Sequence, residues 1–171
     1  NIYCNFFSSF TNGFTIQSAL SNTYHYTSNA KINLGLQVLN KREDDYHNIQ
    51  SIFVEVDLHD ELEFTSASGF KLTAEGADVP VDDSNLISKI YQLIRAKTES
   101  VDTEYAIHLK KKIPMGGGLG GGSSNAAATL NALNQLWKLN FSLQELEKIG
   151  AELGADVPFF IKGGAQLVEG I

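Results

Sequence analysis

A glycine-rich segment constrains this chain more than any other part of its sequence. Six of the 15 glycines in the 171-residue chain lie within residues 116–122, with Leu119 at the centre of the run. Two hydroxyl residues, Ser123 and Ser124, follow directly. Because glycine has no Cβ, the backbone N–H groups of such a segment can turn inward and a ligand can approach them closely. The segment therefore has the composition of a binding loop.

The flanking sequence predicts what this loop binds. Residues 105–113 read as a strand that Pro114 closes, and residues 126–137 have apolar side chains at helical spacing. A glycine-rich turn that opens a helix directs free amides and the positive end of the helix dipole towards a ligand, which favours an anion. A flexible linker would not join a strong strand to a strong helix or carry the apolar Met115 and Leu119. The position therefore predicts a phosphate site.

Three familiar phosphate loops do not fit this segment. The Walker A loop needs lysine, and none lies between Pro114 and Ser124. The glycine spacing of a dinucleotide fold is met, but the acidic residue expected about 20 residues later is missing from residues 137–140. The His-Arg-Asp and Asp-Phe-Gly motifs of protein kinases are absent as well. The loop must belong to another class of phosphate-binding protein.

The order of predicted elements favours an α+β fold. Residues 30–39 alternate, with Ile32, Leu34, Leu36 and Val38 on one face, which predicts a half-buried strand. Several strands precede the first helix, as in α+β domains. The further elements expected are strands at 49–56, 61–65 and 70–74 and a helix after residue 84, capped by Asp83 or Ser84.

The last predicted elements surround a single acidic residue. Ser142 and Glu145 form a capping-box pattern, so a helix is expected to begin there and to end near Gly154. Residues 159–161 are apolar and read as a buried strand, with Pro158 holding the preceding residue extended. Asp156 would then lie between a helix and a strand. The residues alone leave a turn or cap role and a catalytic role equally open.

Composition narrows the classes of function. The chain has 13 Lys and Arg against 20 Asp and Glu, and this net charge of −7 argues against a nucleic-acid binder. Its only cysteine, Cys4, excludes an internal disulfide or a cysteine zinc site. Residues 1–30 carry no charge but seven Phe and Tyr. We interpret residues 1–27 as an aromatic-rich extension of unclear origin, either an interaction strand or a loosely packed segment.

Residues 114–128 resemble the phosphate-binding motif of the GHMP small-molecule kinases. Three further segments, at 30–34, 44–47 and 153–158, agree with that family in order and approximate spacing. The resemblance covers residues 28–171. It implies an α+β fold like domain 2 of ribosomal protein S5, namely the N-terminal ATP-binding domain of such a kinase, without the C-terminal domain that family members carry.

The resemblance also implies residue roles. Lys31 and Asp156 would form the catalytic pair, with Asp156 as general base on the substrate hydroxyl. Asn33 would help to place the substrate, and Tyr46 and His47 would contact a cytosine ring. The loop expected to hold the ATP phosphates comprises Pro114, Met115, Gly116, Gly117, Gly118, Leu119, Gly120, Gly121, Gly122, Ser123 and Ser124.

The activity implied is that of a cytoplasmic kinase with ATP and Mg²⁺ as cofactors and with unassigned metal ligands. Its substrate would be a cytidine diphosphate-linked methylerythritol of the non-mevalonate isoprenoid pathway, phosphorylated on its 2-hydroxyl. No nucleic acid or membrane partner is expected. A kinase for another small alcohol and a non-catalytic nucleotide-binding fragment stay open as alternatives. The sequence departs from the family pattern at Asp45, which replaces the glycine usual before Tyr46. Residues 110–112 are lysines that could contact nucleotide or form a solvated strand edge.

Overall fold

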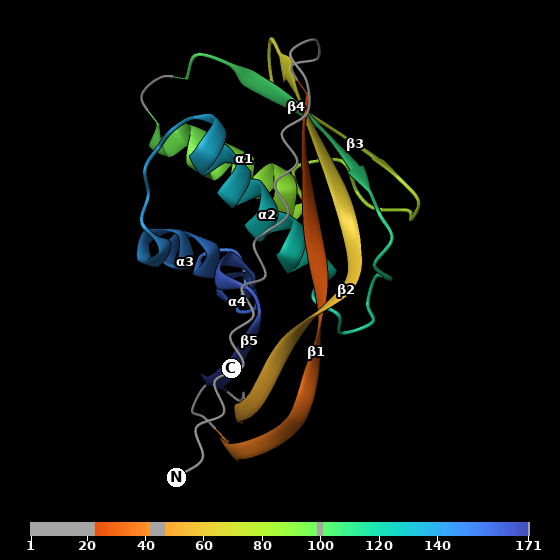
Figure 1. Cartoon of the computed structure of the whole chain (residues 1–171), viewed down its shortest axis with the longest axis vertical. Helices are drawn as coiled ribbons and strands as arrows, with labels where there is room; N and C mark the ends of the chain where they lie inside the picture. Colours follow the sequence, from red (N-terminus) through yellow and green to blue (C-terminus); the bar gives the residue numbers. More distant parts are fainter. Residues whose placement is uncertain (1–22, 42–46, 99–100, 171) are drawn as a thin grey trace.

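The computed structural model describes residues 23–41, 47–98 and 101–170, which form one mixed sheet with helices on one side (Figure 1). In chain order the elements are β1 (Thr23–Lys41), β2 (His47–Ala67), β3 (Lys71–Glu75), α1 (Leu86–Lys97), β4 (Glu104–Lys110), α2 (Gly121–Leu136), α3 (Leu143–Ala151), α4 (Val157–Lys162) and β5 (Ala165–Gly170). Three strands therefore precede the first helix, and the predicted α+β fold class is confirmed.

The long strand β2 organises the sheet. The strand order is β1-β2-β4-β3, with β3 parallel to β4 and the other pairs antiparallel. Residues 61–67 of β2 pair with β4, whereas residues 49–54 pair with β5. The sheet thus has a broad part under the helices and an extension that we call the arm, made of residues 30–41 of β1, 47–56 of β2 and all of β5 (Figure 1).

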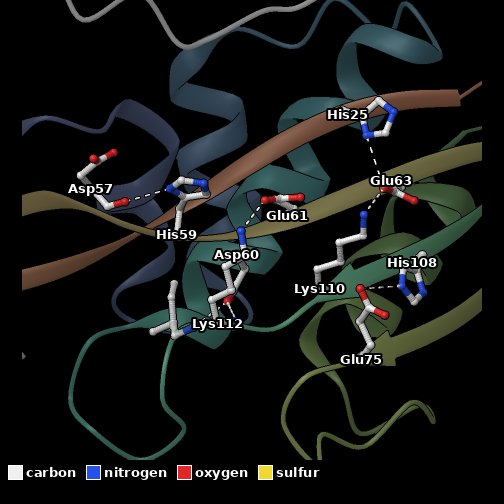
Figure 2. A network of polar contacts seen from close by, with 11 residues as sticks. His25, Asp57, His59, Asp60, Glu61, Glu63, Glu75, His108, Lys110 and Lys112 are labelled. Carbon is white, nitrogen blue, oxygen red and sulfur yellow. Dashed lines mark hydrogen bonds and ion pairs between the residues drawn. The ribbon is translucent and has the colours of Figure 1, made fainter.

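The two faces of the broad part differ in character. Facing the helices, Leu62 and Phe64 of β2 are fully buried and pack with apolar side chains of α1 and α2. Facing away, Glu61 pairs with Lys112, and Glu63 accepts a hydrogen bond of 2.7 Å from Lys110 (Figure 2). Apolar and charged side chains thus alternate along β2 with a period of two residues, as expected for a sheet covered on one side. None of the helices in the described part of the chain is long and apolar enough to cross a membrane.

Two sequence expectations about the strands are wrong. Residues 49–56 and 61–65 belong to one strand, because the register shift between Asn29 and Ala30 leaves two extra residues of β2 in a bulge and the pairing then continues. The apolar face predicted to be half-buried is exposed: Ile32 is 38% and Leu34 53% accessible. The reason is that α4 covers the other face of the arm, the one that carries Lys31, Asn33 and Phe53, so Ile32 and Leu34 point away from the helices. Strand β1 also begins at Thr23, before the predicted domain start at residue 28.

Two helix expectations are also corrected. Residues 159–161 lie in α4 and not in a strand, because Pro158 stands in the first turn, where its missing N–H costs nothing and its fixed φ suits a helix. Helix α1 is capped by Asn85, whose Oδ1 accepts a hydrogen bond of 2.9 Å from the N–H of Ile87, and not by Asp83 or Ser84. The capping box predicted at Ser142 and Glu145 is confirmed at the start of α3.

Candidate active site

The glycine-rich loop turns directly into α2. Gly120 stands at the N-cap position with a φ of 71°, and Gly116 and Gly118 also have positive φ values. A Cβ on Gly120 would lie 2.7 Å from the ring of Phe160 and 3.2 Å from Cγ of Lys31. Both the backbone conformation and the lack of space therefore require glycine there. The first turn of α2 is thus preceded by a loop with few side chains.

A cavity of about 250 Å³ lies against this loop. Residues 114–122 line it, so nine of the eleven predicted phosphate-loop residues gather around one space. Asn85, the N-cap of α1, and Lys111, the residue after β4, also line it. The two serines are placed differently. Ser124 is buried and lines a second cavity beside Glu55, and the Ser123 hydroxyl lies towards Gly154.

Lys31 connects the arm to the loop. Its backbone N–H donates to the carbonyl of Leu119 at 2.9 Å, which fixes strand β1 against the glycine run. Its side chain is almost fully buried and lies 4.1 Å above the ring centre of Phe53. The Nζ donates a hydrogen bond of 2.8 Å to Oδ1 of Asn33, two residues along the same face of the strand. The predicted placement of Lys31 and Asn33 together is thus what the structure shows.

Asp156 completes this group. Its Oδ2 lies 3.6 Å from the Nζ of Lys31. The residue occupies the N-cap position of α4, yet its side chain makes no capping hydrogen bond. Capping is therefore not a role that the side chain adopts, and the sequence's other two interpretations, a turn residue and a catalytic residue, stay predictions. A third of the carboxylate side chain is exposed, so a ligand has access to it.

This arrangement could support the removal of a proton from a bound hydroxyl. A buried cation at 3.6 Å attracts negative charge both on the carboxylate of Asp156 and on an oxygen that loses a proton between them. An ionised carboxylate accepts hydrogen bonds and has no proton to donate, which suits a general base. Phe53 and Phe159 pack edge to face beneath Lys31 and hold this side of the site in place.

Sequence reasoning missed three residues around the site. Phe53 supports the cation, and no pattern in the sequence points to that role. Glu55 lies opposite Lys31 in the register of β1 and β2, and its Oε2 accepts a hydrogen bond of 2.7 Å from the N–H of Gly164. Burial raises the pKa of Glu55, although the hydrogen bond from Gly164 opposes the shift. Asp60 is fully buried beneath the loop. The sequence signal that could have found it is its alternation with Leu62 and Phe64, which places an acidic residue on the inward face of the strand.

Two predicted substrate contacts are not tested by the described structure. Tyr46 lies outside the described residues. His47 is the first residue of β2, where its backbone pairs with Lys41, and its side chain is not described. Among the described residues there is also no group of three or more His, Cys, Asp or Glu that could hold a metal ion.

Comparison with known proteins defines the class. The family described as "GHMP kinases N terminal domain" matches residues 85–164, which span α1, the glycine-rich loop, α2, α3 and α4. A crystal structure of a homoserine kinase from Cytophaga hutchinsonii shares the fold, with a TM-score of 0.62 at 20% identity over 90% of this chain and 50% of that one. The fold and the loop are similar to those of the N-terminal domain of the GHMP kinases.

Within that class, the chain is similar to one kind of enzyme. The 4-diphosphocytidyl-2-C-methyl-D-erythritol kinase of Syntrophus aciditrophicus is 48% identical over 145 residues, 84% of this chain and 52% of the relative. That of Marinobacter nauticus is 46% identical over 147 residues, 84% of this chain and 51% of the relative. A crystal structure of 4-(cytidine 5'-diphospho)-2C-methyl-D-erythritol kinase aligns with a TM-score of 0.74 at 36% identity, covering 85% and 52% of the two chains. The chain spans about half the length of these relatives.

Proposed function

We propose that this chain is the nucleotide-binding part of a kinase that transfers the γ-phosphoryl group of ATP to the 2-hydroxyl of 4-diphosphocytidyl-2-C-methyl-D-erythritol. The observation that carries the proposal is the hydrogen bond between the Lys31 N–H and the Leu119 carbonyl. It places the Lys31–Asp156 pair at the edge of a glycine-rich loop, where a phosphoryl group and an alcohol can meet. The relatives named above support the choice of substrate.

The loop would hold the nucleotide by its backbone. Residues 114–122 line the cavity, and the backbone N–H groups of residues 115–122 would donate to phosphate oxygens, which accept such hydrogen bonds well. Mg²⁺, when bound with ATP, neutralises charge on the phosphates, and in such sites most of its ligands are phosphate oxygens and waters.

The arm would supply the acceptor side of the reaction. Asp156 accepts the proton of the 2-hydroxyl, and Lys31 stabilises the negative charge that develops on that oxygen. A correctly placed general base contributes about 10²–10⁴-fold in rate. Asn33 accepts the Lys31 hydrogen bond through Oδ1, which leaves its amide nitrogen as a donor for the substrate. Positioning and charge neutralisation then provide most of the catalysis, as in other phosphoryl transfers.

The cytidine end of the substrate tests the proposal most sharply. We expect Tyr46 to stack on the cytosine and His47 to hydrogen-bond to it. In the full-length protein, Tyr46→Ala should raise the KM for the cytidine diphosphate substrate by about 10-fold or more, the loss of one base–aromatic stack, while the KM for ATP stays within about twofold.

The measurement is ADP release with ATP and a panel of alcohols that includes homoserine and mevalonate. Phosphorylation of another alcohol in preference to the cytidine diphosphate substrate would replace the proposed substrate. Binding of ATP without turnover of any alcohol would indicate a nucleotide-binding protein. Equal effects of Tyr46→Ala on the two KM values would argue against stacking on cytosine.

A further inference from the structure

A buried carboxylate lies directly beneath the phosphate loop. Asp60 belongs to β2, where Leu62 and Phe64 point to the same side, and all three are fully buried. Glu61 and Glu63 alternate with them on the solvent side, where each meets a lysine (Figure 2). Ionised carboxylates on the solvent face are stable without further explanation. One on the core face is costly unless several donors surround it.

Four donors satisfy Asp60, two at each oxygen. Oδ1 accepts the backbone N–H groups of Lys112 at 2.7 Å and Ile113 at 2.8 Å. Oδ2 accepts the Nζ of Lys111 at 2.5 Å and the Nδ2 of Asn125 at 2.8 Å. A carboxylate with both oxygens doubly engaged has little freedom to move. It therefore fixes the position of whatever these four groups belong to.

The four donors come from the two ends of the phosphate loop. Lys111, Lys112 and Ile113 are the residues that enter it after β4, and Asn125 lies in the first turns of α2 where it ends. Between them the loop contains three glycines with positive φ, and such a segment has many accessible conformations. A single carboxylate thus holds both ends of a flexible loop in place; we call these contacts the clamp.

The same contacts reach the wall of the nucleotide cavity. Lys111 and Asn125 both line it. A Cβ on Gly121 would lie 2.8 Å from the Nζ of Lys111, so this ammonium packs directly under the start of α2. Asn125 also donates to Ser28 of β1 at 2.6 Å, which extends the clamp to the strand that carries Lys31. Asp60 touches neither the loop amides that face the cavity nor the Lys31–Asp156 pair.

From this geometry we infer that Asp60 is a positioning residue for nucleotide binding: it holds the loop in the conformation in which its N–H groups converge on phosphate. The inference rests on the proposed function. An apolar side chain would fill this place in the core at lower cost, so the carboxylate is explained by what it holds and not by the burial it provides. The nucleotide's affinity should then depend on a side chain that does not touch it.

The test compares Asp60→Asn with a matched control, Glu104→Gln, in the full-length protein. Asparagine keeps the shape but turns an NH₂ group towards two of the four donors, which lose their acceptor. Glu104 is a carboxylate at the opposite end of β4, where it accepts from Tyr91 at 2.6 Å and Arg95 at 2.7 Å, away from the loop. Both variants are expected to lower Tm, so stability alone does not distinguish them.

Two measurements distinguish them. By calorimetric titration with a non-hydrolysable ATP analogue, Asp60→Asn should weaken binding about 10- to 100-fold, the range for a lost hydrogen bond to a charged group, and Glu104→Gln by less than about twofold. By hydrogen exchange in the absence of nucleotide, the amides of Lys112 and Ile113 should exchange faster in Asp60→Asn only. Binding within about twofold of wild type in Asp60→Asn, or equal weakening in both variants, would overturn the inference.

A second variant covers the case in which Asp60→Asn does not fold. Asn125→Ala removes the donor on the α2 side and leaves the other three, so about 3- to 10-fold weaker nucleotide binding is expected from a single hydrogen bond. Unchanged affinity in Asn125→Ala would then overturn the inference. If the wild-type protein itself binds no ATP analogue, the proposed function fails, and the exchange of the Lys112 and Ile113 amides still shows whether Asp60 holds the loop.

Discussion

Replacing the carboxylate of Asp156 by an amide should separate chemistry from binding and from stability. Asp156→Asn keeps the size of the side chain but removes the charge and the capacity to accept a proton. The loss of a general base lowers kcat by about 10²–10⁴-fold, which corresponds to about 3–5 kcal/mol of transition-state stabilisation. Because Asp156 does not line the loop cavity, the affinity for ATP should stay within about twofold of wild type.

The effect on folding should be much smaller, and the structure gives its size. Two charges 3.6 Å apart attract by about 1 kcal/mol in a water-like medium and by about 5 kcal/mol near a protein surface. A third of the Asp156 side chain is exposed, so after screening the net contribution of the pair falls towards about 1 kcal/mol. Lys31 keeps its hydrogen bond to Asn33 and its contact with the Phe53 ring in the variant.

The assay combines steady-state kinetics, titration with an ATP analogue and thermal denaturation of the full-length protein. The double variant Lys31→Met/Asp156→Asn should lose far less than the product of the two single losses, because residues that act as a unit are not additive. A fall in kcat of less than about 10-fold would refute the assignment of Asp156 as general base. A loss of ATP affinity in proportion to kcat would refute the separation of the two sites.

Two further predictions concern the loop and the arm. Gly120→Ala should weaken ATP binding and cost about 1 kcal/mol or more in stability, because alanine would have to adopt a positive φ and its Cβ would meet the ring of Phe160. The control is Gly69→Ala, where a Cβ meets nothing within 4 Å and φ is not positive. Equal changes of Tm and ATP affinity in the two variants would contradict the reasoning. Glu55→Gln should raise Tm relative to wild type, and more so as the pH rises. Burial raises the pKa of Glu55 in the folded state, so wild type loses stability as the pH increases from the ordinary carboxyl range through that raised pKa. A Tm difference between Glu55→Gln and wild type that is constant from about pH 4 to about pH 7 would show that Glu55 ionises as readily in the folded as in the unfolded chain.

Local signals in the sequence were sufficient for part of this fold. The glycine run between a strand and a helix predicts the phosphate loop, and the structure places residues 114–122 around one cavity. The capping box at Ser142 is likewise encoded within four residues and is present. In both cases neighbours along the chain make the interaction, so the pattern of residue types is enough to predict it.

Other features could not be predicted because they depend on distant contacts. Residues 157–161 are apolar and contain a proline, which fits either a buried strand or a short helix. Packing of Phe159 against Phe53 and of Phe160 against the loop decides for the helix. The alternation of Ile32 and Leu34 predicts a covered face, yet nothing in the described part of the chain covers it, because α4 packs on the opposite face of the arm, against Phe53. Periodicity identifies a strand face but not what lies against it.

The chain's sequence by itself predicted the class of ligand, since a loop of glycines at the start of a helix favours anions. It also supplied Lys31 and Asp156, 125 positions apart, as separate candidates. Only the tertiary structure brought their charges to 3.6 Å and showed that Asp156 does not cap its helix. It alone distinguished Asp60 from the other acidic residues, because its four donors come from two segments far from β2 in the sequence, residues 111–113 after β4 and Asn125 in α2. Distances between segments far apart in the chain are set by packing, and local sequence carries no record of them.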